Sequence, residues 1–166
     1  MVAQSGMPTH KSEKDGRIGI ISDTHSLMRP EALAALRGSS LIIHAGDIGA
    51  PDVLDELRTI ASVVAVRGNN DKGKWADALP EREVIRFGAT LIYVLHDLKE
   101  LELDPAAAGF HVVISGHSHR PSIEKRNALL FLNPGRAGPR RFHLPVSVAE
   151  IRIRNGKIDP CVIPLE

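Results

Sequence analysis

The chain has 166 residues, 43% hydrophobic and 25% charged, with 21 Lys and Arg against 20 Asp and Glu. This composition is ordinary for one folded domain and excludes global disorder, and a net charge of +1 gives no electrostatic reason to expect nucleic acid or a membrane as the main partner. The single cysteine excludes an internal disulfide and a thiolate zinc cluster, so any metal must be held by nitrogen and oxygen donors.

The first sixteen residues are polar and lack the apolar segment of a signal peptide. We expect residues 1–16 to form a disordered tail and residues 17–166 to form a single domain. No apolar run approaches the length of a membrane-spanning helix. Together with the low cysteine content, this predicts a cytoplasmic protein that has no membrane partner.

The first half of the domain alternates short apolar runs with segments of helical spacing. The predicted strands are 17–22, 41–45 and 62–66, and the predicted helices between them are 30–37 and 51–60. Each helix has a proline in its first turn. The strands are nearly all apolar rather than alternating, which indicates burial on both faces. This order of elements predicts parallel pairing with right-handed crossovers.

The second half contains mainly strands that pair through tight turns. The predicted strands are 83–87, 90–95, 112–115, 122–126, 129–132, 146–154 and 157–163, with a short helix over 97–103. The pairs Gly88-Ala89, Asn127-Ala128 and Asn155-Gly156 supply turns. These strands are too many for one sheet. We therefore expect an α/β fold, a four-layer αββα sandwich of two packed mixed β-sheets flanked by helices.

Polar residues follow the predicted strands at the points where the strands end. The motifs are Asp23-Thr24-His25, Gly46-Asp47, Gly68-Asn69-Asn70-Asp71, His96-Asp97 and Gly116-His117-Ser118-His119. Ligands bind outside the carboxyl ends of the strands in open α/β sheets, so these side chains are expected to collect at one edge. A single Asp-x-His or Gly-Asp pair is a weak signal, whereas the ordered set of five motifs is a strong one.

These residue types suit a pair of divalent metal ions. Imidazole and carboxylate together hold Mn, Fe, Co, Ni or Zn, and donors two residues apart on an extended segment face one pocket. Asp47 can bridge two ions, and such a pair stabilises both the attacking and the leaving oxygen of an in-line displacement. Two dications, the carboxylates of Asp23 and Asp47 and a hydroxide leave a charge of about +1, which attracts an anion such as a phosphodiester.

At these motifs the sequence resembles the calcineurin-like metallophosphoesterase superfamily, and within it the small bacterial and archaeal phosphodiesterases that carry no cap domain. The resemblance assigns one metal to Asp23, His25, Asp47 and His119 and the other to Asp47, Asn69, His96 and His117. It implies that a hydroxide between the metals is the nucleophile. The metals are expected to be two divalent ions, Mn ahead of Fe, Ni, Co or Zn. The residues expected to act at the reacting phosphate are Asp47, Asn69, Asn70 and His96.

Several positions need a separate interpretation. Many larger members of the superfamily carry His where this chain has Asn70, whose amide can donate a hydrogen bond but cannot act as a general acid. We therefore predict a preference for good leaving groups or modest rates. Arg136 stands where the small branch often has Ser, and it either reaches the phosphate or is solvated, the second being the expectation. His44 is expected in the core or behind the ligands, Asp71 either orients a ligand or caps a turn, and Asp97 caps the next helix.

The leading function is a phosphodiesterase or broad phosphatase that acts on a small phosphodiester or phosphomonoester. A non-catalytic interaction scaffold is the alternative, because the same fold serves as a subunit of a eukaryotic membrane-coat complex. Such scaffolds tend to lose ligands, whereas this chain keeps all seven, which favours the enzyme. A nuclease is disfavoured by the lack of basic excess and of a second domain. Exposed strand edges late in the chain also lead us to expect a homodimer.

Overall fold

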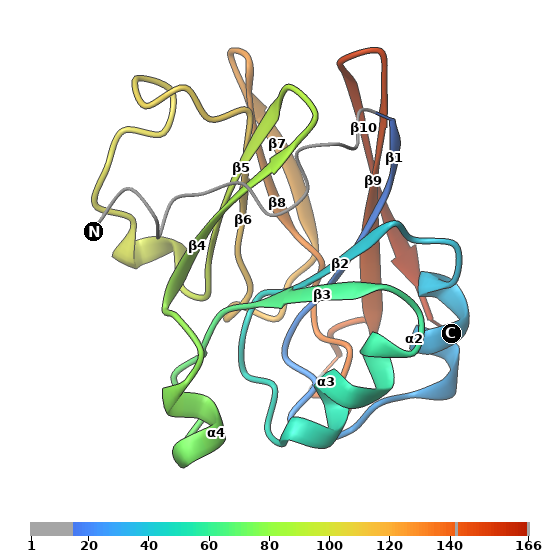
Figure 1. Cartoon of the computed structure of the whole chain (residues 1–166). Helices are drawn as coiled ribbons and strands as arrows, with labels where there is room; N and C mark the ends of the chain where they lie inside the picture. Colours follow the sequence, from blue (N-terminus) through green and yellow to red (C-terminus); the bar gives the residue numbers. More distant parts are fainter. Residues whose placement is uncertain (1–14, 142, 166) are drawn as a thin grey trace.

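Two five-stranded β-sheets pack face to face in the part of the chain that the structure describes (Figure 1). The structure is a computed structural model that describes residues 15–141 and 143–165. The predicted sandwich of two mixed sheets is confirmed. Most of the predicted tail, residues 1–14, lies outside the described residues, and Gly16 already begins the first strand. The division into a tail and one domain stays a prediction.

The first sheet has the strand order β10-β9-β1-β2-β3. Its strands are β1 (Gly16–Ile21), β2 (Leu41–His44), β3 (Ser62–Ala65), β9 (Ser147–Arg154) and β10 (Lys157–Pro164). As predicted, β1, β2 and β3 run parallel, connected through the helices α2 (Pro30–Leu36) and α3 (Pro51–Arg58). The expected burial on both faces holds for β2 and most of β1 but is wrong for β3, which lies at the sheet edge and is largely half-buried or exposed.

The second sheet has the strand order β4-β5-β6-β8-β7. Its strands are β4 (Arg82–Phe87), β5 (Thr90–Leu95), β6 (Val112–Ile114), β7 (Ser122–Arg126) and β8 (Leu129–Asn133). The central strands β5, β6 and β8 are parallel, and β4 and β7 pair antiparallel at the two edges. Asn127 and Asn155 have φ values of 57° and 52°, as expected for the tight hairpin turns that the sequence predicted.

Two short helical segments differ from the prediction. The helix expected over 97–103 is a 3-10 turn, η1 (Leu98–Glu100), which Asp97 caps by accepting a hydrogen bond from Lys99 N. The chain then turns to an extended conformation at Leu101, which ends the turn. The short helix α4 (Lys74–Asp77) was not predicted, because four residues are too few to show a helical period.

Alternate residues of each strand divide between separate apolar layers. Ile43 of β2 packs between the sheets, while its neighbour Ile42 packs against α2 and α3. On the outer face of the second sheet, Tyr93 is covered by Leu101 and Phe110 from the segment that follows η1. The outer layer is therefore helical over the first sheet, whereas the 3-10 turn and a loop cover the second.

The segments that follow β1, β2, β3, β5 and β6 meet at one side of the sandwich. Asp23 N donates to Gly46 O, and Gly116 N donates to His96 O. A further hydrogen bond, from His117 N to the Asp23 side chain, joins the two sheets. In the described residues, no helix has both the length and the apolar character needed to span a membrane.

Candidate metal centre

The loop after β1 carries Asp23 and His25 in an unusual backbone conformation. The φ values are 56° and 47°, a region that non-glycine residues adopt at an energetic cost and that is concentrated at functional sites. Hydrogen bonds to the loop after β2 hold this conformation, since His25 N donates to Asp47 O at 3.1 Å. The same positive φ occurs at five of the seven predicted metal ligands, namely Asp23, His25, Asp47, His117 and His119.

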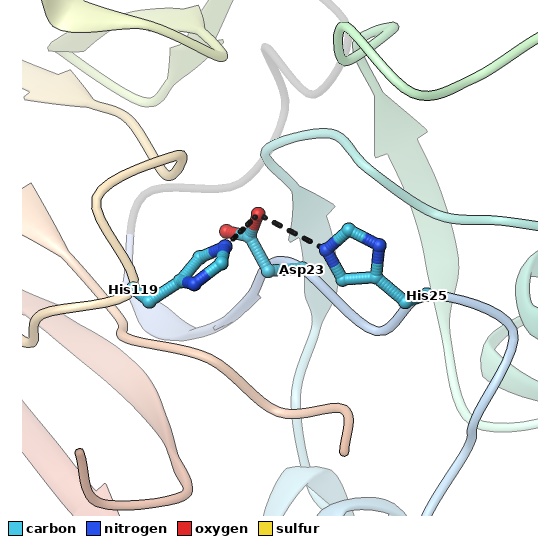
Figure 2. A group of neighbouring side chains, drawn as sticks. All are labelled: Asp23, His25 and His119. Carbon is cyan, nitrogen blue, oxygen red and sulfur yellow. Dashed lines mark ion pairs between the residues drawn. The ribbon is translucent and has the colours of Figure 1, made fainter. Parts of the chain in front are cut away.

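The two carboxylate oxygens of Asp23 have different surroundings. Oδ2 accepts hydrogen bonds from Ser22 Oγ at 2.5 Å and from His117 N at 3.1 Å. Oδ1 lies 3.3 Å from His119 Nε2 and 3.7 Å from His25 Nε2, so the carboxylate sits between two imidazole rings (Figure 2). Asp23 Oδ1 and His25 Nε2 are both sealed from solvent without a hydrogen-bond partner. Since buried polar atoms are normally satisfied, these two atoms fit a cation bound between them.

Asp47 lies where the two halves of the predicted ligand set meet. Its Oδ2 is 3.7 Å from His25 Nε2 and 3.3 Å from His96 Nε2. Asn70 donates to both oxygens, from its backbone N to Oδ1 at 2.9 Å and from its side-chain amide to Oδ2 at 3.1 Å. Asn70 is therefore engaged with Asp47, and the predicted action of Asn70 at the phosphate stays a prediction.

His96, His117 and Asn69 point their donor atoms at one another. His96 Nδ1 lies 2.7 Å from Ala45 O, and a carbonyl only accepts, so in the neutral ring Nδ1 carries the proton and Nε2 presents its lone pair to the site. His117 Nδ1 lies 3.4 Å from His96 Nε2 and 3.2 Å from Asn69 Oδ1. The other ring nitrogen of His117 lies 3.7 Å from Asp97 Oδ2.

The structure thus brings all seven predicted ligands into one cluster. Two groups of three have donor atoms within 4.8 Å of one another, Asp23 with His25 and His119, and Asp23 with Asp47 and His96. Asp23 belongs to both groups, whereas the family resemblance shares Asp47. The contacts of Asp47 Oδ2 with His25 and His96 keep that residue within reach of both groups.

The two carboxyl groups are ionised although both are buried. Burial raises the pKa of Asp23, but its contacts with His119 and His25 and the hydrogen bond from Ser22 outweigh burial and hold the pKa well below its ordinary value. Burial also raises the pKa of Asp47, and the bond with His96 is the chief reason why that pKa is nevertheless lowered. Two neighbouring anionic groups give the cluster the charge that divalent cations require.

His96 and His44 are both buried, but their pKa values move in opposite directions. Burial lowers the pKa of His96, yet the carboxylates of Asp47 and Asp23 raise it to about 9. For His44, burial dominates and lowers the pKa to about 3. The two rings lie near the same carboxylates, and only His96 contacts one directly.

His44 supports the ligand loops from behind, as the sequence led us to expect. Its Nδ1 accepts from Gly46 N at 3.1 Å, so Nε2 carries the proton and donates to Thr24 Oγ1 at 3.0 Å. The Thr24 hydroxyl in turn donates to Ile48 O at 2.8 Å. His44 therefore links the loops after β1 and β2 as a neutral ring.

Asp71 ties the loop after β3 to the loop after β2. Its Oδ2 accepts from Asp47 N at 3.0 Å and from Gly68 N at 2.8 Å, and its Oδ1 accepts from Gly49 N at 2.9 Å. The approach is so close that a Cβ at Gly68 would lie 2.2 Å from Asp47 N, so only glycine fits there. Of the two roles that the sequence left open for Asp71, these contacts fit the one in which it holds a neighbouring predicted ligand, Asp47.

Arg136 differs from its prediction. It is only 6% exposed, so the expectation of a solvated arginine is wrong. Its Nη1 lies 3.3 Å from His119 Nδ1 and 3.2 Å from His119 Nε2, and its Nε donates to Pro139 O. Burial lowers its pKa from the ordinary arginine value. The sequence around Arg136 shows no periodic pattern from which its burial could have been read.

Known proteins are similar to this chain in sequence or in fold. A family model described as a calcineurin-like phosphoesterase superfamily domain matches residues 17–156. A probable metallophosphoesterase of Methanothermobacter thermautotrophicus is 39% identical over 88% of this chain and 91% of its own length. A phosphodiesterase of Methanocaldococcus jannaschii is 28% identical over 72% of this chain and 82% of its own length. The structure of Vacuolar Protein Sorting 29 from Cryptosporidium parvum superposes with a TM-score of 0.71 at 18% identity, covering 92% of this chain and 98% of that one.

Proposed function

The chain belongs to the calcineurin-like phosphoesterase superfamily, and on that premise we propose that it is a phosphodiesterase with a dinuclear metal site. One observation carries the proposal. Asp23 Oδ1 and His25 Nε2 are buried, unpartnered and 3.7 Å apart inside a cluster of seven donor side chains. A structural loop gains nothing from leaving two such atoms unsatisfied, whereas a metal site requires them.

The donor set fits two divalent ions. We propose that the first is held by Asp23, His25, Asp47 and His119, and the second by Asp47, Asn69, His96 and His117. When bound, such a pair would lower the pKa of a water molecule so that hydroxide could attack the phosphorus in line with the leaving group, and would stabilise charge on the phosphoryl oxygens. Imidazole, carboxylate and amide donors suit Mn, Fe, Co, Ni or Zn, and we propose Mn.

The surrounding groups fix the orientation of the donors. Ala45 O accepts the Nδ1 proton of His96 and leaves Nε2 free to coordinate. Asp97 faces Nε2 of His117, which turns Nδ1 of that ring toward Asn69. These contacts set which ring nitrogen of each histidine faces the cluster before any substrate arrives.

The position of Asn70 bears on the choice of substrate. An amide cannot protonate a leaving group, and this amide is held by Asp47. We therefore propose activity on diesters with good leaving groups, which the 28% identity to a phosphodiesterase of M. jannaschii supports. The substitution Asn70→His is expected to raise the rate on poor leaving groups, and a loss of activity with metals retained would contradict this role.

The test is hydrolysis of bis(p-nitrophenyl) phosphate by the full chain with Mn. The wild type is expected to turn over, and Asp47→Ala and His117→Ala are expected to lose about a hundredfold or more. His143→Ala is the matched control, because His143 is exposed and lies outside the proposed ligand set. Absence of turnover with every divalent metal, despite bound metal, would favour the alternative, a metal-binding interaction scaffold of the same fold.

Two further expectations accompany the proposal. We propose a cytoplasmic enzyme and a homodimer, the latter because β7 is exposed along its whole length and forms an edge of the second sheet. Light scattering coupled to gel filtration measures the mass in solution, and a monomer at all concentrations would remove the homodimer.

A further inference from the structure

Arg136 is fixed beside Asp23 by its own backbone. The next two residues form hydrogen bonds with the loop after β1, Ala137 N to Ser22 O at 3.0 Å and Gly138 N to Asp23 O at 3.1 Å. Arg136 itself forms a parallel β-bridge with Val146. The side chain therefore starts from a backbone position that is rigidly related to the carboxylate of Asp23.

The guanidinium group of Arg136 lies over the ring of His119. Its Nη1 is nearly equidistant from both ring nitrogens, at 3.2 Å and 3.3 Å. A nitrogen in the ring plane at equal distances from both would overlap ring carbon, so Nη1 must lie over the face. His119 Nε2 also lies 3.3 Å from Asp23 Oδ1. Arg136 and Asp23 therefore contact the same histidine ring.

The positive charge of Arg136 lacks the partner that burial normally demands. In residues 15–141 and 143–165, no carboxylate forms an ion pair with it, although Asp23 and Asp47 are close enough to act on its charge. Buried arginines are as a rule paired with an anion. Because Arg136 forms no ion pair with a described carboxylate, its partner is expected to be an anion that binds from outside the protein.

One edge of the guanidinium is open to receive that anion. Nε donates to Pro139 O and Nη1 faces His119, but Nη2 forms no hydrogen bond with a described residue. Among the described residues, the unpartnered side-chain atoms that are sealed from solvent are those of Asp23 and His25, and Nη2 is not among them. Although Arg136 is only 6% exposed, its terminal nitrogen is thus accessible next to the cluster.

We propose that Arg136 binds a non-bridging oxygen of the substrate phosphate and is the specificity residue that lets this site accept a phosphomonoester dianion beside a diester. The inference rests on the proposed function, since it takes the phosphate to be held at the dinuclear site. Arg136 raises the charge of the site from about +1 to about +2, which matches an anion with two negative charges. Phosphomonoesters carry that charge above a pKa of about 6, whereas a diester carries one.

The test compares two substrates that release the same leaving group, p-nitrophenyl phosphate and bis(p-nitrophenyl) phosphate. Arg136→Met removes the charge and keeps most of the bulk. Its kcat/KM is expected to fall about tenfold more on the monoester than on the diester, in line with the loss of a charge-assisted hydrogen bond. Arg136→Lys, which keeps the charge, is expected to restore most of the wild-type ratio of kcat/KM on the monoester to kcat/KM on the diester.

Binding of inorganic phosphate to the Mn-loaded protein, measured by calorimetry, gives a readout without turnover. Arg136→Met is expected to weaken it about tenfold or more while the bound Mn, measured by mass spectrometry, is unchanged. Arg29→Met is the matched control, because Arg29 holds the same segment through Gly138 O. A structural role predicts that both substitutions lower the two esterase activities equally.

The outcomes are separable. An unchanged substrate ratio with unchanged phosphate affinity overturns the role of Arg136 and leaves the phosphoesterase proposal intact. Equal losses on both substrates in Arg136→Met and Arg29→Met, without weaker phosphate binding, also overturn it. If the wild type hydrolyses neither ester but its phosphate affinity depends on Arg136, the anion site stands and the proposed function fails.

Discussion

The loops that follow β1 and β2 and the loops that follow β5 and β6 face the same site, but they are held in different ways. Between the first pair, the backbone pairing of the strands continues beyond their ends, with Asp23 N bound to Gly46 O and His25 N to Asp47 O. The carboxylate side chains that they carry are 0% and 3% exposed. Backbone hydrogen bonds that extend the pairing of β1 and β2 therefore hold this half together.

The half carried by the second sheet is more open. The side chain of His117 is 43% exposed, and its ring contacts Asn69, His96 and Asp97 at distances between 3.2 Å and 3.7 Å. Its loop is anchored by Gly116 N to His96 O and by the Asn133 amide to Gly116 O. A ligand set that is already assembled binds its ion with less loss of side-chain freedom. The ion near Asp23 and His25 should therefore bind more tightly than the one near His117.

The largest expected effect is on the number of metal ions that a variant of each half retains. After removal of free Mn, the wild type is expected to keep about two ions per chain. Asp47→Ala should keep neither, because Asp47 is shared by the two proposed ions and its Oδ2 lies 3.7 Å from His25 Nε2 and 3.3 Å from His96 Nε2. His117→Ala should keep the tighter ion. Metal analysis by mass spectrometry gives the count.

His143→Ala is the control for that experiment and should behave as the wild type. Loss of both ions from His117→Ala at the same free Mn would contradict the difference between the halves. It would mean that the two ions bind as one unit.

The next largest effect is on the free energy of unfolding, when a residue that holds the loops of one half is substituted. Asp71→Ala leaves three backbone N–H groups, those of Asp47, Gly49 and Gly68, without their acceptor. We expect the metal-free protein to lose about 3 kcal/mol in free energy of unfolding and about 10 °C in Tm. Asn133→Ala removes a weaker, neutral support of the second half and should cost about 1.5 kcal/mol.

Asp77→Ala is the matched control for Asp71→Ala, since Asp77 is exposed, and it should change the unfolding free energy by less than about 0.5 kcal/mol. Urea unfolding in the presence of a chelator measures all three. If Asn133→Ala proves the more costly of the two supports, the first half is not the better-held one.

In both halves, the sequence predicted some features of the site and missed others. The strands and the five polar motifs could be predicted because each depends on local patterns: apolar runs, turn residues and polar residues at strand ends. The meeting of the motifs followed from the rule that parallel strands end at the same edge. Local patterns of this kind account for Asp23, His25 and Asp47 in the first half and for His117 in the second.

The contacts made by Asp71 and Arg136 join distant segments, and the sequence did not identify their partners. Asp71 accepts from Gly49 and Asp47, more than twenty positions away, and Arg136 is buried by a ring that belongs to another loop. The edge position of β3 was missed for the same reason. The order of strands in a sheet is decided by how crossovers and late strands pack, not by the composition of one strand.

The two buried histidines, His44 and His96, predict how stability and metal binding depend on pH. Burial holds the pKa of His44 at about 3 in the fold, against 6.5 for the free group. Between these values the unfolded chain binds a proton that the folded protein does not, so stability falls as the pH falls. One such proton changes the free energy of unfolding by about 1.4 kcal/mol per pH unit.

Substitution of His44 isolates this contribution. His44→Gln keeps a donor for Thr24 and an acceptor for Gly46 N, and between pH 6 and pH 5 it should be less sensitive to acid than the wild type by about 1.4 kcal/mol per pH unit. His143→Gln should keep the slope of the wild type. Equal slopes for His44→Gln and the wild type in metal-free urea titrations would show that His44 is not held neutral.

The smallest effect is the proton that His96 exchanges for a metal ion. In the metal-free site its pKa is raised to about 9, since the effect of the neighbouring carboxylates exceeds that of burial. Only the neutral ring coordinates, so at pH 7.5 Mn binding should release about one proton from His96, in addition to the proton that a metal-bound water gives up when it becomes hydroxide. Calorimetry in two buffers with different heats of ionisation counts the protons. His44→Gln should release the same number, because His44 is already neutral. A count near one, the proton from the bound water alone, would mean that His96 is already neutral before Mn binds and that the carboxylates of Asp47 and Asp23 do not raise its pKa.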